Sequence, residues 1–168
     1  MIDGMAAMCR ENETADTTAG ALRRNRTLAA VTRGKILIVE DEPEIAGMLE
    51  YALKRSGFTT ALAEDGLHAC RLIERERPDL VLLDVMMPGL DGWEVCRLVR
   101  SVPDPEIATT PIIMVTALGS QNDRIKGLEL GADGFIPKPY SVREVVLQAG
   151  NLVARRRQER IVRGTQCP

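Results

Sequence analysis

Five short apolar runs, each followed by residues at helical spacing, constrain the fold of this chain more than any other feature of its sequence. Runs rich in Ile, Val and Leu, and too short to cross a membrane, are typical of strands buried on both faces of a sheet. The second run is the least apolar, which favours a place near the edge of the sheet. The predicted strands are KILIV (35–39), FTTALA (58–63), DLVLLD (79–84), PIIMVT (111–116) and GFIPK (134–138).

The segments between these runs indicate helices. Pro43 suits the first turn of a helix, and Gly131 suits the position just after a helix end. The stretch SVPDPEIATT (101–110) contains two prolines and is predicted to be a loop. Strands that alternate with helices predict an α/β fold, here a doubly wound, five-stranded parallel sheet with helices on both faces.

A chain of 168 residues has room for one domain of ordinary size with tails. Composition and periodicity predict a flexible N-terminal extension over 1–33, a folded domain over 34–155 and a basic C-terminal tail over 156–168. A net charge of -2 gives no general argument for nucleic-acid binding. The sequence contains neither a membrane-spanning run nor the apolar stretch of a signal peptide, so we expect a cytoplasmic location.

The four cysteines form no CxxC pair, and the chain has a single histidine, His68. A zinc site would need clustered partners, so this kind of site is excluded. We expect free thiols in a reducing cytoplasm.

Four of the five predicted strands end in polar residues. These residues are Glu40 and Asp41 after the first strand, Asp84 at the end of the third, Thr116 at the end of the fourth and Lys138 at the end of the fifth. Ligand sites in open α/β sheets lie outside the carboxyl ends of the strands, so we expect these side chains to meet. Each one alone could be a helix cap, a turn residue or a solvated strand end. Together, three clustered carboxylates repel one another and need a cation or raised pKa values.

The chemistry of this set favours phosphoryl transfer. Carboxylate oxygens are the ligands that Mg²⁺ takes while it keeps several waters. A lysine and a hydroxyl opposite a metal site suit the oxygens of a phosphoryl group. Aspartate can itself accept a phosphoryl group, and as a carboxylate it needs no general base, which fits the absence of a histidine from the set.

Four motifs carry a resemblance to a known family: ILIVEDEP, LVLLDVMMPGLDGWE, PIIMVTAL and LGADGFIPKPY. In this order and with this spacing they resemble the receiver domain of bacterial response regulators, over about residues 35–155. The resemblance implies a flavodoxin-like sheet with strand order 2-1-3-4-5, as in the chemotaxis member of the family.

The resemblance also assigns roles to the acidic residues. Asp84 corresponds to the phosphoacceptor. Glu40 and Asp41 correspond to the acidic pair that holds Mg²⁺, Asp41 directly and Glu40 through water, and the backbone carbonyl of Met86 is the remaining protein ligand. Glu-Asp in place of Asp-Asp is a common variant of the pair.

A second set of residues corresponds to the family's switch. Thr116 matches the hydroxyl that moves toward the phosphoryl group, and Lys138 matches its salt-bridge partner. Phe135 stands where the family places its switch aromatic. The Lys138–Pro139 bond matches a position that is often cis, and cis bonds are essentially confined to X-Pro.

Two positions that influence dephosphorylation in the family, two residues after the acceptor and two after the threonine, are Met86 and Leu118 here. Polar side chains at these positions help to place the attacking water. Two apolar residues suggest slow self-dephosphorylation, and a phosphoryl half-life of seconds in the pure protein would count against this hypothesis.

The implied function is a phosphoreceiver rather than an enzyme with a separate substrate. Its expected partners are a sensor histidine kinase or a phosphotransfer protein and an unknown effector, with a possible phosphorylation-dependent homodimer through the fourth helix, fifth strand and fifth helix of the fold. We expect a stand-alone receiver, with the N-terminal receiver fragment of a DNA-binding transcriptional regulator as the alternative. An aspartyl-phosphate hydrolase would need a second aspartate at position 86, and an inert receiver would not need the intact set of site residues. Nucleic-acid binding by this chain alone is not expected.

Overall fold

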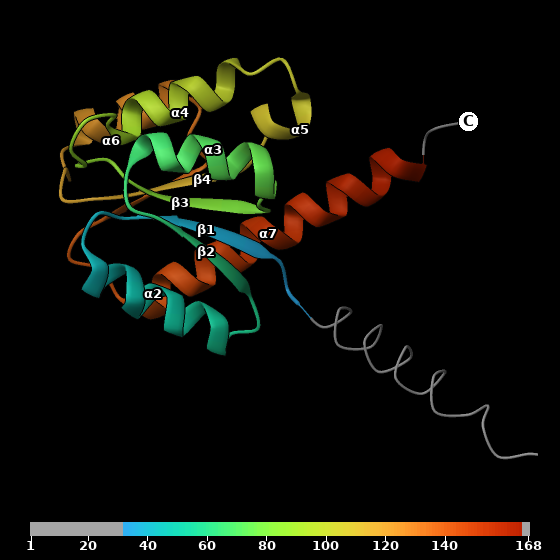
Figure 1. Cartoon of the computed structure of the whole chain (residues 1–168), viewed down its shortest axis with the longest axis horizontal. Helices are drawn as coiled ribbons and strands as arrows, with labels where there is room; N and C mark the ends of the chain where they lie inside the picture. Colours follow the sequence, from blue (N-terminus) through green and yellow to red (C-terminus); the bar gives the residue numbers. More distant parts are fainter. Residues whose placement is uncertain (1–31, 166–168) are drawn as a thin grey trace, which may run out of the picture. The chain divides into compact units, whose positions relative to one another are not determined.

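Strands and helices alternate along residues 32–165, the part of the chain that this computed structural model describes (Figure 1). The strands are β1 (Lys35–Val39), β2 (Thr59–Ala63), β3 (Leu80–Asp84), β4 (Ile112–Thr116) and β5 (Gly134–Pro137). The helices are α2 (Pro43–Arg55), α3 (Gly66–Glu76), α4 (Gly92–Ser101), α5 (Pro105–Ala108), α6 (Gln121–Glu129) and α7 (Val142–Thr165).

The five strands form one parallel sheet in the order β2-β1-β3-β4-β5. The α/β fold class and the strand order predicted from the sequence are therefore confirmed. β2 lies at an edge, as its weaker apolar character indicated. Because the strand order reverses direction between β1 and β3, the crevice at their carboxyl ends is where such sheets bind ligands.

Alternate residues of the strands divide the core between the two faces of the sheet. One face carries Leu37, Val81 and Met114 and is covered by α3 and α4. The opposite face carries Ile36 and Ile113 and is covered by α2 and α7 (Figure 1). Both faces are buried, which is why the strands read as continuous apolar runs rather than as alternating patterns.

The segment over 101–110, which the two prolines predicted to be a loop, contains one extra turn of helix, α5. Asp104 caps this turn by accepting a hydrogen bond from the Glu106 amide at 2.9 Å, and Pro105 stands at the first helical position. Prolines at this position favour a helix start instead of preventing a helix. The loop prediction was wrong over residues 105–108 because both prolines were interpreted as breaks, whereas Pro105 begins a helical turn.

Helix α7 runs without interruption to Thr165, across the predicted boundary between 155 and 156. Residues of the predicted basic tail have partners on the body of the domain. Arg157 donates to the Thr32 carbonyl at 2.9 Å, and Arg160 pairs with Asp79 at 2.9 Å. The domain boundaries themselves stay predictions, and most of the predicted N-terminal extension lies outside the described residues.

Cys70 and Cys96 are free thiols, as expected, whereas Cys9 and Cys167 lie outside the described residues. Within residues 32–165, no helix combines the length and the apolar character needed to span a membrane.

Gly92 lets the start of α4 press against the end of β3. Its amide donates to the Val85 carbonyl at 3.1 Å. A Cβ at this position would lie 2.3 Å from the Asp84 carbonyl oxygen and 2.7 Å from the Val85 Cα. Since both obstacles are backbone atoms, no side-chain rotation can relieve the clash, and the position accepts only glycine.

We therefore expect Gly92→Ala to lower the free energy of unfolding by about 1–3 kcal/mol, the usual cost of overpacking a filled site. Gly47→Ala in α2 is the matched control, because a Cβ there meets nothing within 4 Å. That change should raise stability by about 0.5–1 kcal/mol, since alanine is the better helix former. Urea denaturation of both variants provides the measurement, and a Gly92→Ala protein as stable as the parent would contradict the close approach.

Candidate functional site

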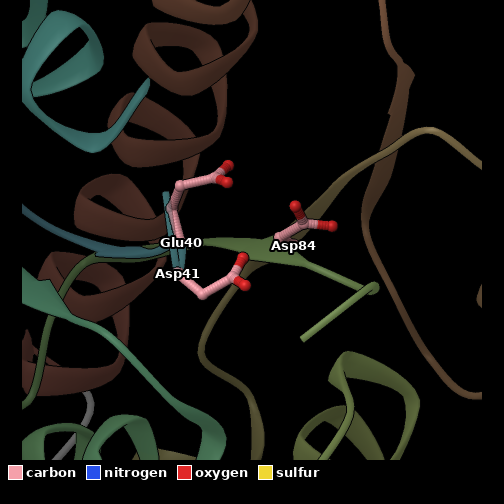
Figure 2. Close-up of side chains that lie close together, drawn as sticks. All are labelled: Glu40, Asp41 and Asp84. Atoms are coloured by element: carbon pink, nitrogen blue, oxygen red, sulfur yellow. The ribbon is translucent and has the colours of Figure 1, made fainter. Parts of the chain in front are cut away.

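The carboxyl ends of neighbouring strands bring together the polar residues that the sequence singled out. Glu40 and Asp41 follow β1, and Asp84 is the last residue of β3. Figure 2 shows that the carboxylates of these three residues gather in one small space. Lys138 reaches the same space from the residue after β5. The predicted clustering of these four residues is what the structure shows.

The Lys138 ammonium is the centre of the charge network. It contacts Asp84 Oδ2 at 2.6 Å and the two oxygens of Glu40 at 3.1 and 3.3 Å. The side chains of Glu40 and Asp84 are only 2% and 4% exposed. Carboxylates buried this deeply remain ionised only beside a positive charge, and the Lys138 ammonium is that charge.

Asp84 is held at both oxygens. One oxygen accepts the backbone N–H of Met86 at 2.9 Å, while the other faces Lys138. The Met86 side chain is itself exposed. The carboxylate is therefore fixed in orientation at the end of a rigid central strand, which is the arrangement that a reacting group requires.

The three carboxylates form the one group within residues 32–165 whose geometry suits a metal ion. One oxygen from each of Glu40, Asp41 and Asp84 lies within 4.8 Å of the others. Unlike its neighbours, Asp41 is half-buried, and its carboxylate makes no hydrogen bond or ion pair in this part of the chain. Three hard oxygen donors, of which one has no protein partner, fit the needs of Mg²⁺.

Burial and charge shift the pKa values of the site. Burial raises the pKa of Glu40 above its ordinary value; the hydrogen bond from Lys138 opposes this rise and the charge of Asp84 adds to it. Burial alone would lower the pKa of Lys138, but hydrogen bonds and charges from Asp84 and Glu40 outweigh it and raise the pKa to about 12. Lys138 is therefore a permanent cation of the site at neutral pH.

Within residues 32–165, neither Thr116 nor Phe135 forms a hydrogen bond or ion pair with these charges. Thr116 ends β4, is fully buried, and its hydroxyl accepts the Leu118 amide at 3.2 Å. Phe135 in β5 is half-buried and packs at the edge of the core that α3 and α4 cover. The Lys138–Pro139 peptide is cis, as the resemblance implied.

Tyr140 is a neighbour of the site to which the sequence assigned no role. Its half-buried phenol has a raised pKa, mainly because of burial; the charge of Lys138 opposes this rise, and the charges of Glu40 and Asp84 add to it. The pairing of Glu40 with Lys138 was also not predicted. The only signal for either was sequence proximity to a strand end, which does not specify the direction of a side chain.

Comparisons with known proteins agree on one family. The family model of the response regulator receiver domain matches residues 36–149. A receiver domain of a signal transduction histidine kinase from Syntrophus aciditrophicus is 38% identical, with a TM-score of 0.66 over 72% of this chain and 90% of its own. A putative response regulator from Chloroflexus aurantiacus is 36% identical, with a TM-score of 0.67 over 72% of this chain and 98% of its own.

A third structure similar to this chain is the beryllofluoride-activated N-terminal receiver domain of RstA from Klebsiella pneumoniae. It is 34% identical, with a TM-score of 0.64, and the match covers 71% of this chain and 97% of that domain.

Replacing Lys138 with an uncharged residue should lower the free energy of unfolding. We expect Lys138→Met to lower the free energy of unfolding by about 3 kcal/mol at about pH 7.5, because two buried carboxylates lose their counter-charge. The double variant Lys138→Met/Asp84→Asn should recover much of this loss, since one of the two charges is gone. Urea denaturation measures both, and a double variant no more stable than the single one would contradict the account.

The loss of unfolding free energy in Lys138→Met, relative to the parent chain, should also depend on pH. The pKa of Glu40 is already raised in the folded chain, and losing the hydrogen bond from Lys138 removes an influence that lowers it. A carboxyl whose pKa is higher in the folded than in the unfolded state favours folding as the pH falls. The deficit should therefore shrink when unfolding is measured at about pH 5.5 instead of about pH 7.5.

Proposed function

The chain belongs to the response regulator receiver domain family of two-component signalling, and on that premise we propose that Asp84 accepts a phosphoryl group from a phosphohistidine. The observation that carries the proposal is the oriented Asp84 carboxylate between the Met86 amide and the Lys138 ammonium. The donor is a sensor histidine kinase or a phosphotransfer protein. The domain acts on itself and turns over no separate substrate.

The transfer step needs only an ionised carboxylate. An Asp84 oxygen forms a bond to phosphorus while the phosphorus–nitrogen bond of the donor breaks, and the imidazole retains the electron pair of that bond. No proton has to leave Asp84, so no general base is required. Position 86 carries methionine, which cannot act as the second aspartate of an aspartyl-phosphate hydrolase, and this disfavours the enzyme alternative.

Glu40, Asp41, Asp84 and the Met86 backbone carbonyl would hold Mg²⁺. The clustered oxygens fit this ion, as does the Asp41 carboxylate, which has no partner within residues 32–165. A bound Mg²⁺ would offset the negative charge that Asp84 and the incoming phosphoryl group bring to the same place. Glu40, already bound to Lys138, would act through water.

Phosphorylation would redistribute the contacts of Lys138 and Thr116. The added group carries about -1.5 to -2 charge at neutral pH, so it attracts the Lys138 ammonium more strongly than a carboxylate does. The Thr116 hydroxyl, which accepts the Leu118 amide, can rotate to donate to a phosphoryl oxygen. Phe135 would then move inward, and the surface formed by α6, β5 and α7 would change shape.

That surface is the proposed contact for an effector or for a second copy of the chain. Output as a stand-alone receiver, with the N-terminal receiver of a DNA-binding regulator as the alternative, is a prediction, and so is the cytoplasmic location. The slow self-dephosphorylation expected from Met86 and Leu118 stays a prediction.

Trp93 reports on the proposed chemistry. It is the sole tryptophan, stands at the second position of α4, and lies under the Lys126 ammonium at 4.7 Å from the ring centre. Beryllofluoride with Mg²⁺ should change its fluorescence in a saturable way, because a phosphoryl mimic on Asp84 repositions the loop that leads into α4.

Two controls make this test specific. Fluoride and Mg²⁺ without beryllium should have no effect, and Asp84→Asn should abolish the response while it preserves the shape of the side chain. An equal response in Asp84→Asn, or none in the parent protein, would favour an inert receiver that serves only as an interaction module.

A further inference from the structure

Helix α6 meets the core of the domain through a glycine. Gly127 is the one residue of this helix that is buried, whereas the apolar side chains of Ile125 and Leu128 are 45% and 54% exposed. The helix therefore has no fully buried apolar side chain. Most of the stability of a helix in a protein comes from the packing of its apolar face, so α6 is held less firmly than a helix with a buried apolar stripe.

Three side chains from different elements meet α6 at this glycine. A Cβ at Gly127 would lie 3.2 Å from Met114 Sδ, 3.3 Å from Trp93 Cζ3 and 3.5 Å from Phe135 Cδ2. Trp93 belongs to α4, and Phe135 in β5 is the residue to which the resemblance assigned the switch aromatic. Because the contacts are close, a movement of either ring changes the surface on which α6 rests.

Trp93 also follows directly on the backbone that holds the proposed phosphoacceptor. Gly92, the residue before it, donates to the Val85 carbonyl at 3.1 Å and lies against the backbone of Asp84. Met86, in the same loop, donates its amide to the Asp84 carboxylate at 2.9 Å. The indole is only 9% exposed, so a displacement of this loop is transmitted to the ring and to its neighbours.

Lys126, the residue before Gly127, joins α6 to the same ring. Its ammonium lies 4.7 Å from the centre of the Trp93 ring, within the range of a cation–π interaction. The Lys126 side chain forms no hydrogen bond or ion pair within residues 32–165. The contact coexists with the ion pair between Lys138 and Asp84, so it belongs to the state without a phosphoryl group.

We propose that the contact of Lys126 with Trp93 holds α6 in its position in the unphosphorylated domain and is broken when Asp84 is phosphorylated. The inference rests on the proposed function and names a residue that would regulate the surface of α6, β5 and α7. Inward movement of Phe135 would remove part of the support at Gly127, and movement of the loop after Asp84 would displace the indole. Lys126 is thus a positioning residue that opposes the switch.

Binding of beryllofluoride, used as the phosphoryl mimic, measures this opposition. Isothermal titration calorimetry of the full chain with Mg²⁺ and excess fluoride gives the dissociation constant of the mimic. Lys126→Gln should bind it about threefold more tightly than the parent, because the switch no longer breaks the cation–π contact. Lys126→Arg keeps a cation over the ring and should bind the mimic as the parent does.

Arg124→Gln is the matched control. It removes the same charge from the same helix, but the Arg124 side chain has no hydrogen bond, ion pair or ring contact within residues 32–165. Its affinity should not exceed that of the parent, since the loss of a positive charge alone does not favour an anionic mimic. In a Trp93→Leu background, Lys126→Gln should leave the affinity unchanged, because the ring that the ammonium contacts is absent.

The possible results separate this inference from the proposed function. Saturable binding by the parent, with no tighter binding by Lys126→Gln than by Arg124→Gln, would overturn the inference and leave the proposed function standing. A gain in affinity that persists in the Trp93→Leu background would also overturn it. The comparison of Lys126→Gln with Arg124→Gln changes only exposed residues, so it decides even if Trp93→Leu does not fold. Absence of saturable binding by the parent would contradict both.

Discussion

The ion pairs between Lys138 and the carboxylates of Asp84 and Glu40 are the interaction on which the rest of the site depends. They hold two buried negative charges at the end of the sheet, while the third carboxylate, that of Asp41, has no hydrogen bond or ion pair within residues 32–165. If Lys138 moved toward a newly attached phosphoryl group, Glu40 would lose its ion pair with Lys138. The contacts of the loop after β5 would change as well. The same cation therefore stabilises one state of the domain and would favour the other after phosphorylation, which is what a switch requires.

The sheet fixes the positions of these charges. β1, β3, β4 and β5 are neighbours, so the residues that end them are brought to one edge whatever their distance in sequence. Both faces of the sheet are packed, which prevents the strands from sliding because a shift of one residue would exchange the two cores. Close approach of Gly92 to the backbone of Asp84 adds a further constraint on the acceptor. The positions of the site residues thus depend on packing across the whole sheet as well as on the contact of Gly92 with Asp84.

Much of this arrangement can be predicted from sequence because parallel strands and their carboxyl ends follow simple rules. The apolar runs identify the strands, and the polar residues after them identify Glu40, Asp41, Asp84 and Lys138. The sequence does not reveal which charged side chains become buried, because their hydrogen-bond partners are distant in the chain. The burial of Arg156 requires the carbonyls of the α5 turn, and that turn in turn depends on a local cap at Asp104. Charged residues at a helix end are usually solvated, so their pattern alone gives no reason to expect burial.

The central claim is that Asp84 is the residue that accepts the phosphoryl group. Incubating the full chain with acetyl phosphate and Mg²⁺, reducing the acyl phosphate with borohydride and mapping the modified residue by peptide mass spectrometry tests it directly. The account predicts a modification at Asp84 and none at Asp41 or Glu40. A label on either of those two residues, or a chain that stays unmodified while an unrelated receiver treated in parallel is labelled, would contradict it.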